Sequence, residues 1–209
     1  MPSHCSPSRR KSPSGPCGGL GGCVMARARL HPERMSITTR RGDDGRTDML
    51  FGRRIEKDDP RMEAIGAVDE LNAVLGVARA GGPEPTAREV VDHLQGLLVG
   101  LMGELAVHPD DTERYRNAGF PSITEDDVEW ATRESAAIEA AGVSFDGWAR
   151  PGESGSLVSA HFDLARVVCR RAERRVLAIE AGLENPGIVR FLNRCSDLLW
   201  LLARKTEGE

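Results

Sequence analysis

The pattern of apolar and polar residues predicts helices over most of the chain. Apolar side chains recur at steps of three and four, which places them on one face of a helix. The helices are expected at about residues 61–80, 86–108, 124–141 and 156–181, with a last one starting at Asn185–Pro186. Their apolar stripes consist of Ile65, Val68, Leu71, Leu75 and Ala78, then Val90, Leu94, Leu97 or Leu98, Leu101 and Leu105, then Leu164, Val168, Ala172, Val176 and Ile179, and finally Ile188, Leu192, Cys195, Leu199 and Leu202. Strand patterns are essentially absent, so the sequence predicts an all-α bundle of about five helices.

Glycine and capping residues mark where these helices begin and end. Gly81 ends the first helix and Gly182 ends the fourth, while residues 142–155 form a loop that contains Gly and Pro. Thr124 with Asp127 three residues later is typical of an N-terminal cap.

The first 34 residues differ from the rest of the chain. They are rich in Ser, Pro, Gly and Arg and have no apolar periodicity, so we expect a disordered extension at residues 1–34 and one helical domain at residues 35–209. Their composition resembles that of an organelle transit peptide, but Gly and Pro interrupt the amphipathic helix that such a peptide needs. We therefore interpret residues 1–34 as an extension without a targeting role, with Met35 as the natural start.

Charge is unevenly distributed along the chain. Residues 1–34 hold six basic residues and one acidic residue, whereas residues 35–209 hold 22 basic and 31 acidic residues, a net charge of −9. An acidic body argues against general nucleic-acid binding. No run of about 18 apolar residues is present, so we expect no membrane span. Cys169 and Cys195 lie in helical patterns without a zinc-site spacing, and we expect them to be buried thiols of a cytoplasmic protein.

Arginines concentrate in the fourth predicted helix. Arg166, Arg170 and Arg174 follow one another at steps of four and so share a face, with Arg171 and Arg175 beside them. Arginine binds polyphosphate oxygens bidentately and stays charged, so the row predicts an anionic partner. On spacing alone, a solvated basic face is an equally good interpretation.

A second candidate for anion binding precedes the first helix. The segment from Gly42 to Gly45 can fold tightly, with backbone N–H groups and the hydroxyls of Thr39 and Thr47 facing phosphate oxygens. It is not a Walker loop, because no Gly-Lys-Ser/Thr ends it and no strand precedes it. Taken alone, such a stretch is more often simply a turn.

Polar residues also interrupt the first and last helices. Asp69 and Glu70 stand among apolar neighbours, as do Asn193, Arg194 and Asp197. They form the solvated side of an amphipathic helix, which is the usual case, or they face inward or toward another subunit. Asp69 is a natural ion-pair partner for an arginine of the basic helix.

Five blocks of sequence together resemble one known family. They are Thr39-Arg-Arg-Gly-Asp-Asp-Gly-Arg-Thr47, Lys57-Asp-Asp-Pro60, Gly66-Ala-Val-Asp-Glu-Leu-Asn72, Arg166-Val-Val-Cys-Arg-Arg-Ala-Glu-Arg174 and Phe191-Leu-Asn-Arg-Cys-Ser-Asp197. In this order they resemble the PduO-type cob(I)alamin adenosyltransferases, over about residues 37–204. The resemblance implies a homotrimer of five-helix bundles with a ferritin-like up-down arrangement, and ATP and cobalamin bound between neighbouring subunits.

The resemblance also implies roles for individual residues. Arg166 would pair with Asp69 across the subunit boundary and, with Arg170, would serve catalysis. Trp148 and Phe162 would contact cobalamin, although Phe162 also fits the bundle core. ATP would be bound by Thr39, Arg40, Arg41, Gly42, Thr47, Asp48, Lys57, Arg170, Arg171, Glu173, Arg174 and Asn193.

The implied reaction needs no nucleophile from the protein. Cobalt(I) of reduced cobalamin attacks the 5′ carbon of ATP and expels triphosphate, and Mg²⁺ is held mainly by the phosphates rather than by a protein metal site. Departures from the family pattern lie on the corrin side: Trp148 stands where a phenylalanine is usual, Asp163 stands where a histidine is usual, and Glu153 follows Pro151-Gly152 in place of a second glycine.

Three rival functions fit parts of the same sequence. A non-catalytic trimer that delivers adenosylcobalamin to a mutase would need the same binding residues. A helical scaffold with an acidic partner would not need Thr39, Lys57, Glu173 and Asn193, and a phosphoryl transferase would release ADP. Expected protein partners are the chain itself, a cobalamin reductase and an adenosylcobalamin-dependent mutase.

Overall fold

The structure is a computed structural model that describes residues 38–143, 147–179 and 183–207. The chain divides into two units, residues 1–38 and residues 39–209. The extension expected at residues 1–34 lies outside the described residues.

The second unit is mostly helical, as the sequence predicts. Five of its helices have 16 residues or more, and α3 is a single short helix. The helices are α1 (Pro60–Ala80), α2 (Pro85–Leu105), α3 (Thr112–Asn117), α4 (Glu125–Ala140), α5 (Leu157–Leu177) and α6 (Gly187–Lys205), with 3-10 turns η1 (Leu50–Gly52) and η2 (Pro109–Asp111). None of the helices in the described part of the chain is on its own long and apolar enough to cross a membrane, although α2 with the segment Pro109–Asn117 passes that test as a pair bent by 108°.

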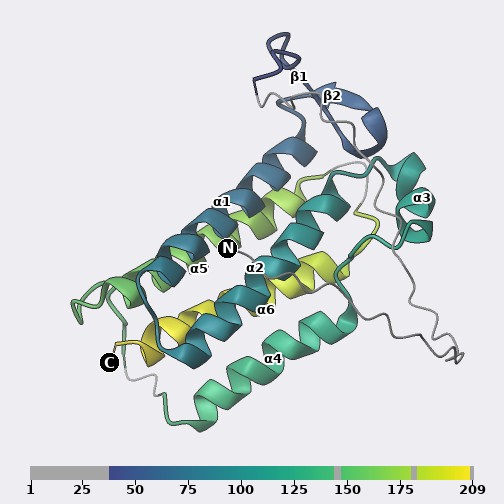
Figure 1. Cartoon of the computed structure of the whole chain (residues 1–209). Helices are drawn as coiled ribbons and strands as arrows, with labels where there is room; N and C mark the ends of the chain where they lie inside the picture. The colour runs from purple at the N-terminus through teal and green to yellow at the C-terminus, as the bar shows by residue number, and fades with distance from the viewer. Residues whose placement is uncertain (1–37, 144–146, 180–182, 208–209) are drawn as a thin grey trace, which may run out of the picture. The chain divides into compact units, whose positions relative to one another are not determined.

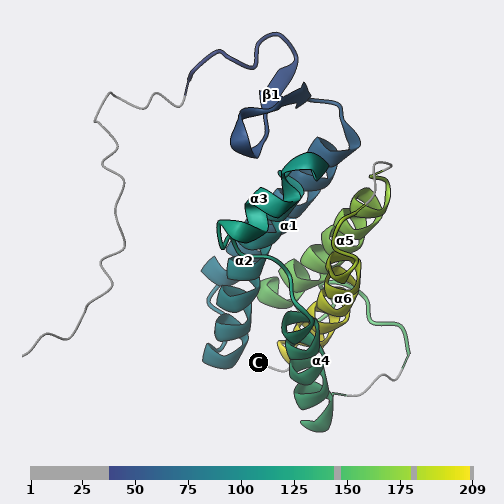
Figure 2. The same cartoon turned by 90° about the vertical axis from the view of Figure 1, so that its right-hand side faces the viewer.

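The long helices lie side by side in the order α2, α1, α5, α6 and α4 (Figures 1 and 2). Two ion pairs fix the direction of α5 against α1: Arg175 lies 3.3 Å from Glu63, and Arg171 pairs with Glu70. Residue numbers rise along α5 as they fall along α1, so the two helices are antiparallel. The C-terminal end of α5 therefore lies beside the first turns of α1.

The core consists of the apolar faces of these helices. Phe162 of α5 and Phe191 of α6 are fully buried, together with leucines of α1, α2 and α6. Burial of an apolar side chain of this size contributes about 1.5–3 kcal/mol relative to exposure. The predicted stripe of the last helix is confirmed in full, since each of its residues is buried.

Capping groups set the helix starts. The carboxylate of Asp59 accepts a hydrogen bond from the N–H of Arg61 at 2.8 Å, ahead of Pro60 in the first turn of α1. Thr124 and Asp127 form the predicted capping box at the start of α4. A cap of this kind stabilises a helix by about 1 kcal/mol.

The stripe predicted for α5 is wrong at its first position. Leu164 is 47% exposed, and the buried face includes Phe162 and Ala165 in its place. A helix has 3.6 residues per turn, so residues spaced by exactly four move gradually around its surface and leave the buried face. Residues spaced alternately by three and four remain on one face. The helix also ends at Leu177, before the expected end near residue 181.

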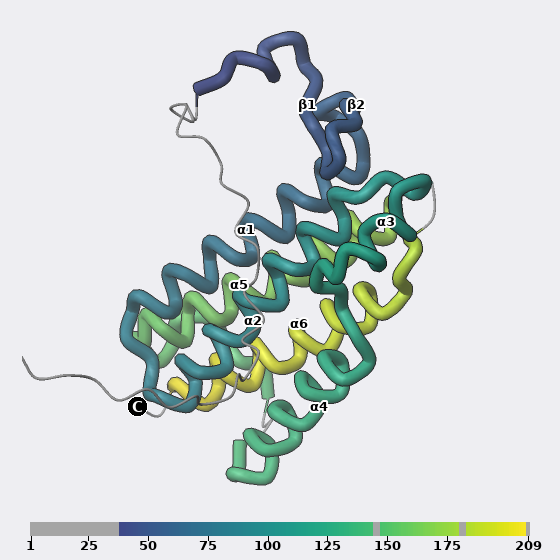
Figure 3. The backbone as a smooth tube through the Cα atoms, turned by 45° about the vertical axis from the view of Figure 1, so that its right-hand side comes forward, coloured from purple at the N-terminus to yellow at the C-terminus, as the bar shows by residue number. Residues whose placement is uncertain are grey.

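The expectation that strands are absent is also wrong. Strands β1 (Arg46–Asp48) and β2 (Arg54–Glu56) form an antiparallel hairpin in which Thr47 pairs with Ile55 (Figure 3). Each strand has three residues, and two of the three are charged. Such a strand has too few apolar positions to produce a period of two.

Candidate functional site

The predicted anion-binding loop lies directly before and against the hairpin. The ammonium group of Lys57 donates a hydrogen bond of 2.7 Å to the carbonyl of Gly42, and the N–H of Lys57 donates to the carbonyl of Gly45 at 2.9 Å. A Cβ atom added at Gly42 would lie 2.9 Å from Nζ of Lys57, closer than real Cβ contacts come. Glycine at position 42 therefore allows Lys57 to approach the loop backbone.

Arg54 of β2 braces the other side of the loop. Its guanidinium donates to the carbonyl of Arg41 at 2.7 Å and to the carboxylate of Asp44 at 3.0 Å. The N–H of Arg46 and the Arg54 guanidinium lower the pKa of the Asp44 carboxyl. The sequence did not predict a role for Arg54, because the position of Arg54 depends on a hairpin that has no recognisable sequence pattern.

The loop backbone is folded tightly. Arg40 has φ 57°, a left-handed conformation that costs a non-glycine residue roughly 1–2 kcal/mol. The carbonyl of Arg40 accepts a hydrogen bond from the N–H of Asp43 at 3.3 Å, and Arg41 pairs with Asp48 at 3.0 Å. The side chains of Thr39 and Arg40 remain exposed at the entrance of the loop.

The hairpin is attached to the bundle at its turn. The N–H of Leu50 donates to the carbonyl of Ala106 at 3.0 Å, and Arg53 pairs with Asp111 at 2.5 Å. Phe51 packs edge-on against Phe120, with ring centroids 6.3 Å apart. These contacts hold the turn of the hairpin, and with it the adjoining loop, against the end of α2.

The arginine row of α5 contains both paired and unpaired members. Arg170 and Arg174 are exposed and form no hydrogen bond or ion pair within the described residues, whereas Arg171 and Arg175 pair with glutamates of α1. Arg171 and Arg175 thus stabilise the α1–α5 contact, whereas the guanidinium groups of Arg170 and Arg174 have no partner among the described residues.

Arg166 and Asp69 do not meet within one chain. Arg166 is half-buried, and its Nε lies 4.0 Å from Asp163 without a hydrogen-bond partner. Asp69 is exposed on α1 and forms no ion pair among the described residues. Their predicted contact crosses a subunit boundary, so it stays a prediction.

Two of the predicted residues, Glu173 of α5 and Asn193 of α6, meet at a small cavity. Asn193 donates to the carboxylate of Glu173 at 3.4 Å and accepts from Arg194 at 2.5 Å. A cavity of about 400 Å³ lies beside them, lined also by Val128, Val189 and Arg190. The Asn193 amide and the Glu173 carboxylate can together bind a ligand group that both donates and accepts hydrogen bonds.

The loop lies at the same end of the bundle as Glu173 and Asn193, and no hydrogen bond or ion pair among the described residues joins it to them. Lys57 lies three residues before α1, and Arg175 of α5 pairs with Glu63 in the first turn of α1. No hydrogen bond or ion pair in the described ranges joins the loop to α5 or α6. A single chain therefore presents two separate halves of the predicted ATP site.

The two predicted cobalamin contacts are placed very differently. Trp148 is 91% exposed, which is unusual for so large an aromatic side chain. Phe162 has no exposed surface, so contact with a ligand would require core side chains to move. Both assignments stay predictions.

The fold and the site define a mostly helical protein with a braced, glycine-containing loop and an exposed arginine pair at one end of its bundle. The chain belongs to the cobalamin adenosyltransferase family, whose sequence model matches residues 37–206.

Relatives and solved structures agree with this membership. The chain is 37% identical over 172 residues to the cobalamin adenosyltransferase of Cupriavidus metallidurans, covering 80% of this chain and 86% of that protein. It is 34% identical over 179 residues to the corrinoid adenosyltransferase PduO of Citrobacter freundii, covering 84% of this chain and 51% of that protein. The chain thus spans about half the length of PduO relatives. A variant PduO-type ATP:corrinoid adenosyltransferase from Lactobacillus reuteri, complexed with cobalamin and ATP, superposes with a TM-score of 0.74 at 27% identity, covering 83% of this chain and 94% of that chain.

Proposed function

We propose that the chain transfers the 5′-deoxyadenosyl group of ATP to cob(I)alamin, giving adenosylcobalamin and triphosphate. The observation that supports this most directly is the loop braced by Lys57 and Arg54 at the same end of the bundle as the unpaired guanidinium groups of Arg170 and Arg174. The family match over residues 37–206 supports the same reaction.

In this reaction, cobalt(I) supplies the electron pair of the new cobalt–carbon bond. The bond from the 5′ carbon to oxygen breaks, and triphosphate leaves with the electron pair of that broken bond. The protein aligns the two reactants and stabilises the charge that builds on the leaving group. Planar, permanently charged guanidinium groups suit that task.

Mg²⁺ forms part of the proposal as a partner of ATP. The described residues contain no cluster of three or more His, Cys, Asp or Glu side chains that could hold a metal ion. Mg²⁺ is commonly bound through one or two carboxylates together with phosphates and water. Here it would take most of its ligands from the triphosphate.

The proposed active form is a homotrimer of five-helix, ferritin-like bundles. In it, Arg166 of one subunit pairs with Asp69 of the next, and ATP bridges the loop of one chain and the arginine helix of its neighbour. Trp148 would cover an apolar face of the corrin ring. The buried free thiols Cys169 and Cys195 support a cytoplasmic, reducing location.

An anaerobic spectroscopic assay tests the activity. The full chain is mixed with chemically reduced cobalamin and Mg-ATP, and the visible spectrum is followed for adenosylcobalamin while triphosphate is quantified separately. Equal amounts of adenosylcobalamin and triphosphate are expected. ADP as the phosphate product would identify a phosphoryl transferase, and binding of both substrates without product would identify a delivery protein.

A further inference from the structure

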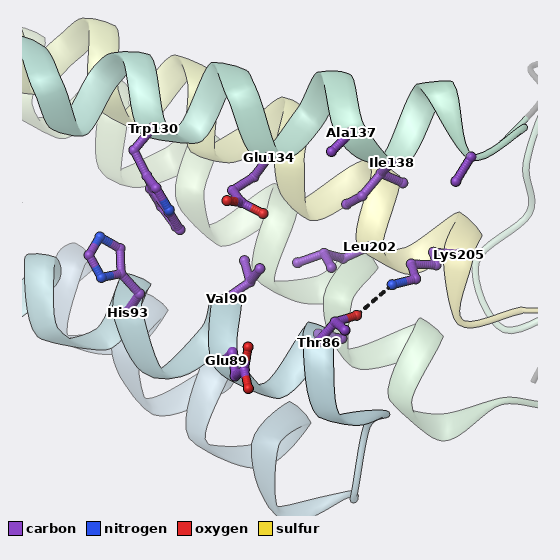
Figure 4. Close-up of a pocket in the computed structure, with 12 residues that line it drawn as sticks. Thr86, Glu89, Val90, His93, Trp130, Glu134, Ala137, Ile138, Leu202 and Lys205 are labelled. Carbon is purple, nitrogen blue, oxygen red and sulfur yellow. Dashed lines mark hydrogen bonds between the residues drawn. The ribbon is translucent and has the colours of Figure 1, made fainter.

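None of the predicted site residues lines a groove that lies between α2 and α4 and is floored by α6. It has a volume of about 400 Å³, within the range of roughly 300–1,000 Å³ that is typical of small-molecule sites. Val90, Ile138 and Leu202 form its apolar surface (Figure 4). We call it the α2–α4 groove.

The α2–α4 groove shares no lining residue with the cavity beside Asn193. It includes Lys205 at the end of α6, whereas the predicted ATP contact Asn193 lies 12 residues earlier on the same helix. At a rise of about 1.5 Å per residue, that spacing corresponds to roughly 18 Å. Neither the arginine row nor the loop lines the groove.

The charged groups of the groove do not neutralise one another. Lys205, the one lysine or arginine among its lining residues, donates to Glu84 at 2.5 Å and to Thr86 at 2.7 Å, so its charge has a partner. Glu89 and Glu134 have no hydrogen bond or ion pair among the described residues. Figure 4 shows the half-buried Glu134 side chain pointing from α4 toward the groove. The groove therefore has two unpaired negative charges beside an apolar surface.

An aromatic pair closes one end of the groove. Trp130 of α4 and His93 of α2 have ring centroids 4.2 Å apart. Trp130 is half-buried, so it offers part of its indole ring to an occupant. Indole rings attract cations through the negative face of the π system.

We propose that the α2–α4 groove binds a small amphipathic organic cation. Its apolar body lies over Val90 and Leu202, and its ammonium group lies beside Glu134 within reach of Trp130. An anion would meet two unpaired carboxylates, and a neutral apolar molecule would leave them without a counter-charge. The charge pattern thus selects the class of ligand.

Titration with 2-phenylethylammonium tests the proposal. The full ¹⁵N-labelled chain, saturated with Mg-ATP at constant ionic strength, is followed through the indole N–H signal of Trp130, which is assigned with Trp130→Phe. A saturable shift is expected. The neutral 2-phenylethanol and the anionic 3-phenylpropanoate should each bind at least about tenfold more weakly, because neither brings a positive charge to the Glu134 carboxylate.

Variants separate the groove from non-specific binding. Glu134→Gln should weaken binding of 2-phenylethylammonium about tenfold. Glu139→Gln, on the same helix but outside the groove, should leave binding unchanged. Ala137→Phe should abolish binding, because Ala137 lines the groove at an exposed position where a ring fills space without displacing the core.

Four results would overturn the proposal: no saturable shift, equal affinity for the three probes, equal effects of Glu134→Gln and Glu139→Gln, or binding that is found only when Mg-ATP is left out. The last result would assign the probe to the nucleotide site. None of these outcomes depends on whether the chain transfers an adenosyl group.

Discussion

At the scale of single residues, pairing distinguishes the arginines of α5. Arg171 and Arg175 are held by glutamates of α1, and their removal would weaken a helix contact. Arg170 and Arg174 stabilise nothing that the structure describes within the chain, so their charges are free for a ligand. A substitution of Arg170 or Arg174 should therefore lower activity without lowering the stability of the fold.

Arg170→Ala is expected to lower kcat about 10²–10³-fold, because it removes one donor to the charge on the leaving triphosphate. The free energy of unfolding should change by less than about 0.5 kcal/mol, since the side chain is exposed and has no partner. Anaerobic kinetics and urea denaturation measure the two effects. Arg133→Ala, on the exposed face of α4, is the control. It should leave kcat unchanged and should also change the free energy of unfolding by less than about 0.5 kcal/mol. A large loss of stability with Arg170→Ala would contradict the prediction.

At the scale of the helices, two polar contacts join elements that are distant in sequence. Asp163 of α5 lies 2.6 Å from Arg204 of α6, and both side chains are almost completely buried. Glu84 caps the start of α2 and also pairs with Lys205 at the end of α6. Each contact fixes one helix end or face against another.

Asp163→Asn is expected to destabilise the fold by about 3 kcal/mol, because it leaves the buried Arg204 without its closest counter-charge. Glu207, 2.8 Å from Arg204, limits the loss. The matched control is Glu125→Gln, which breaks a pair with Arg190 whose side chains are more than half exposed. That change should cost less than about 1 kcal/mol. Equal shifts in urea denaturation would contradict the difference in burial.

The ion pair of Glu84 with Lys205 should make the stability of the fold depend on pH. Hydrogen bonds from Lys205 and Thr86 lower the pKa of Glu84 from 4.5 to about 2. The folded state therefore holds the carboxylate charged at pH values where the unfolded chain has bound a proton, and this contribution to stability is present above pH 4.5 and lost as the pH falls toward 2. Glu84→Gln should flatten the stability profile in that window. Glu139→Gln should keep the slope of the unmodified chain, and an unchanged slope with Glu84→Gln would contradict the assignment.

The sequence predicted the long helices because their apolar residues keep a regular period over four or five turns. It did not predict β1 and β2, whose three-residue strands are too short and too charged to have a period, nor α3, which has six residues. The residues of the site were named from the order of five sequence blocks. Arg54 was not predicted as a site residue, because its contacts with the loop exist only once the hairpin has formed.

At the scale of the whole molecule, no hydrogen bond or ion pair among the described residues joins the two halves of the predicted ATP site. If neighbouring subunits complete the site, two inactive variants should restore activity when they assemble together. Lys57→Ala removes the support of the loop, and Arg170→Ala removes a donor of the helix. In randomly mixed trimers, about a quarter of the sites would combine an intact loop with an intact helix.

The measurement is activity after the two variants are denatured and refolded together, relative to each refolded alone. A gain toward roughly a quarter of the unmodified activity is expected. A mixture no more active than its components would place loop and helix in the same subunit. Sedimentation of the mixed sample checks that trimers have formed.

The hydrogen bond from the N–H of Leu50 to the carbonyl of Ala106 has a consequence for hydrogen exchange. An isolated two-stranded ribbon opens readily, so its amide protons exchange quickly with solvent. The amide of Leu50 is instead bonded to the residue that ends α2, and it can exchange only when that contact opens. Deuterium uptake at Leu50 should therefore follow the slow rate of the last turn of α2 and not the faster rate of the hairpin strands. The turn of the hairpin thus opens with the bundle, although its sequence lies outside every long helix.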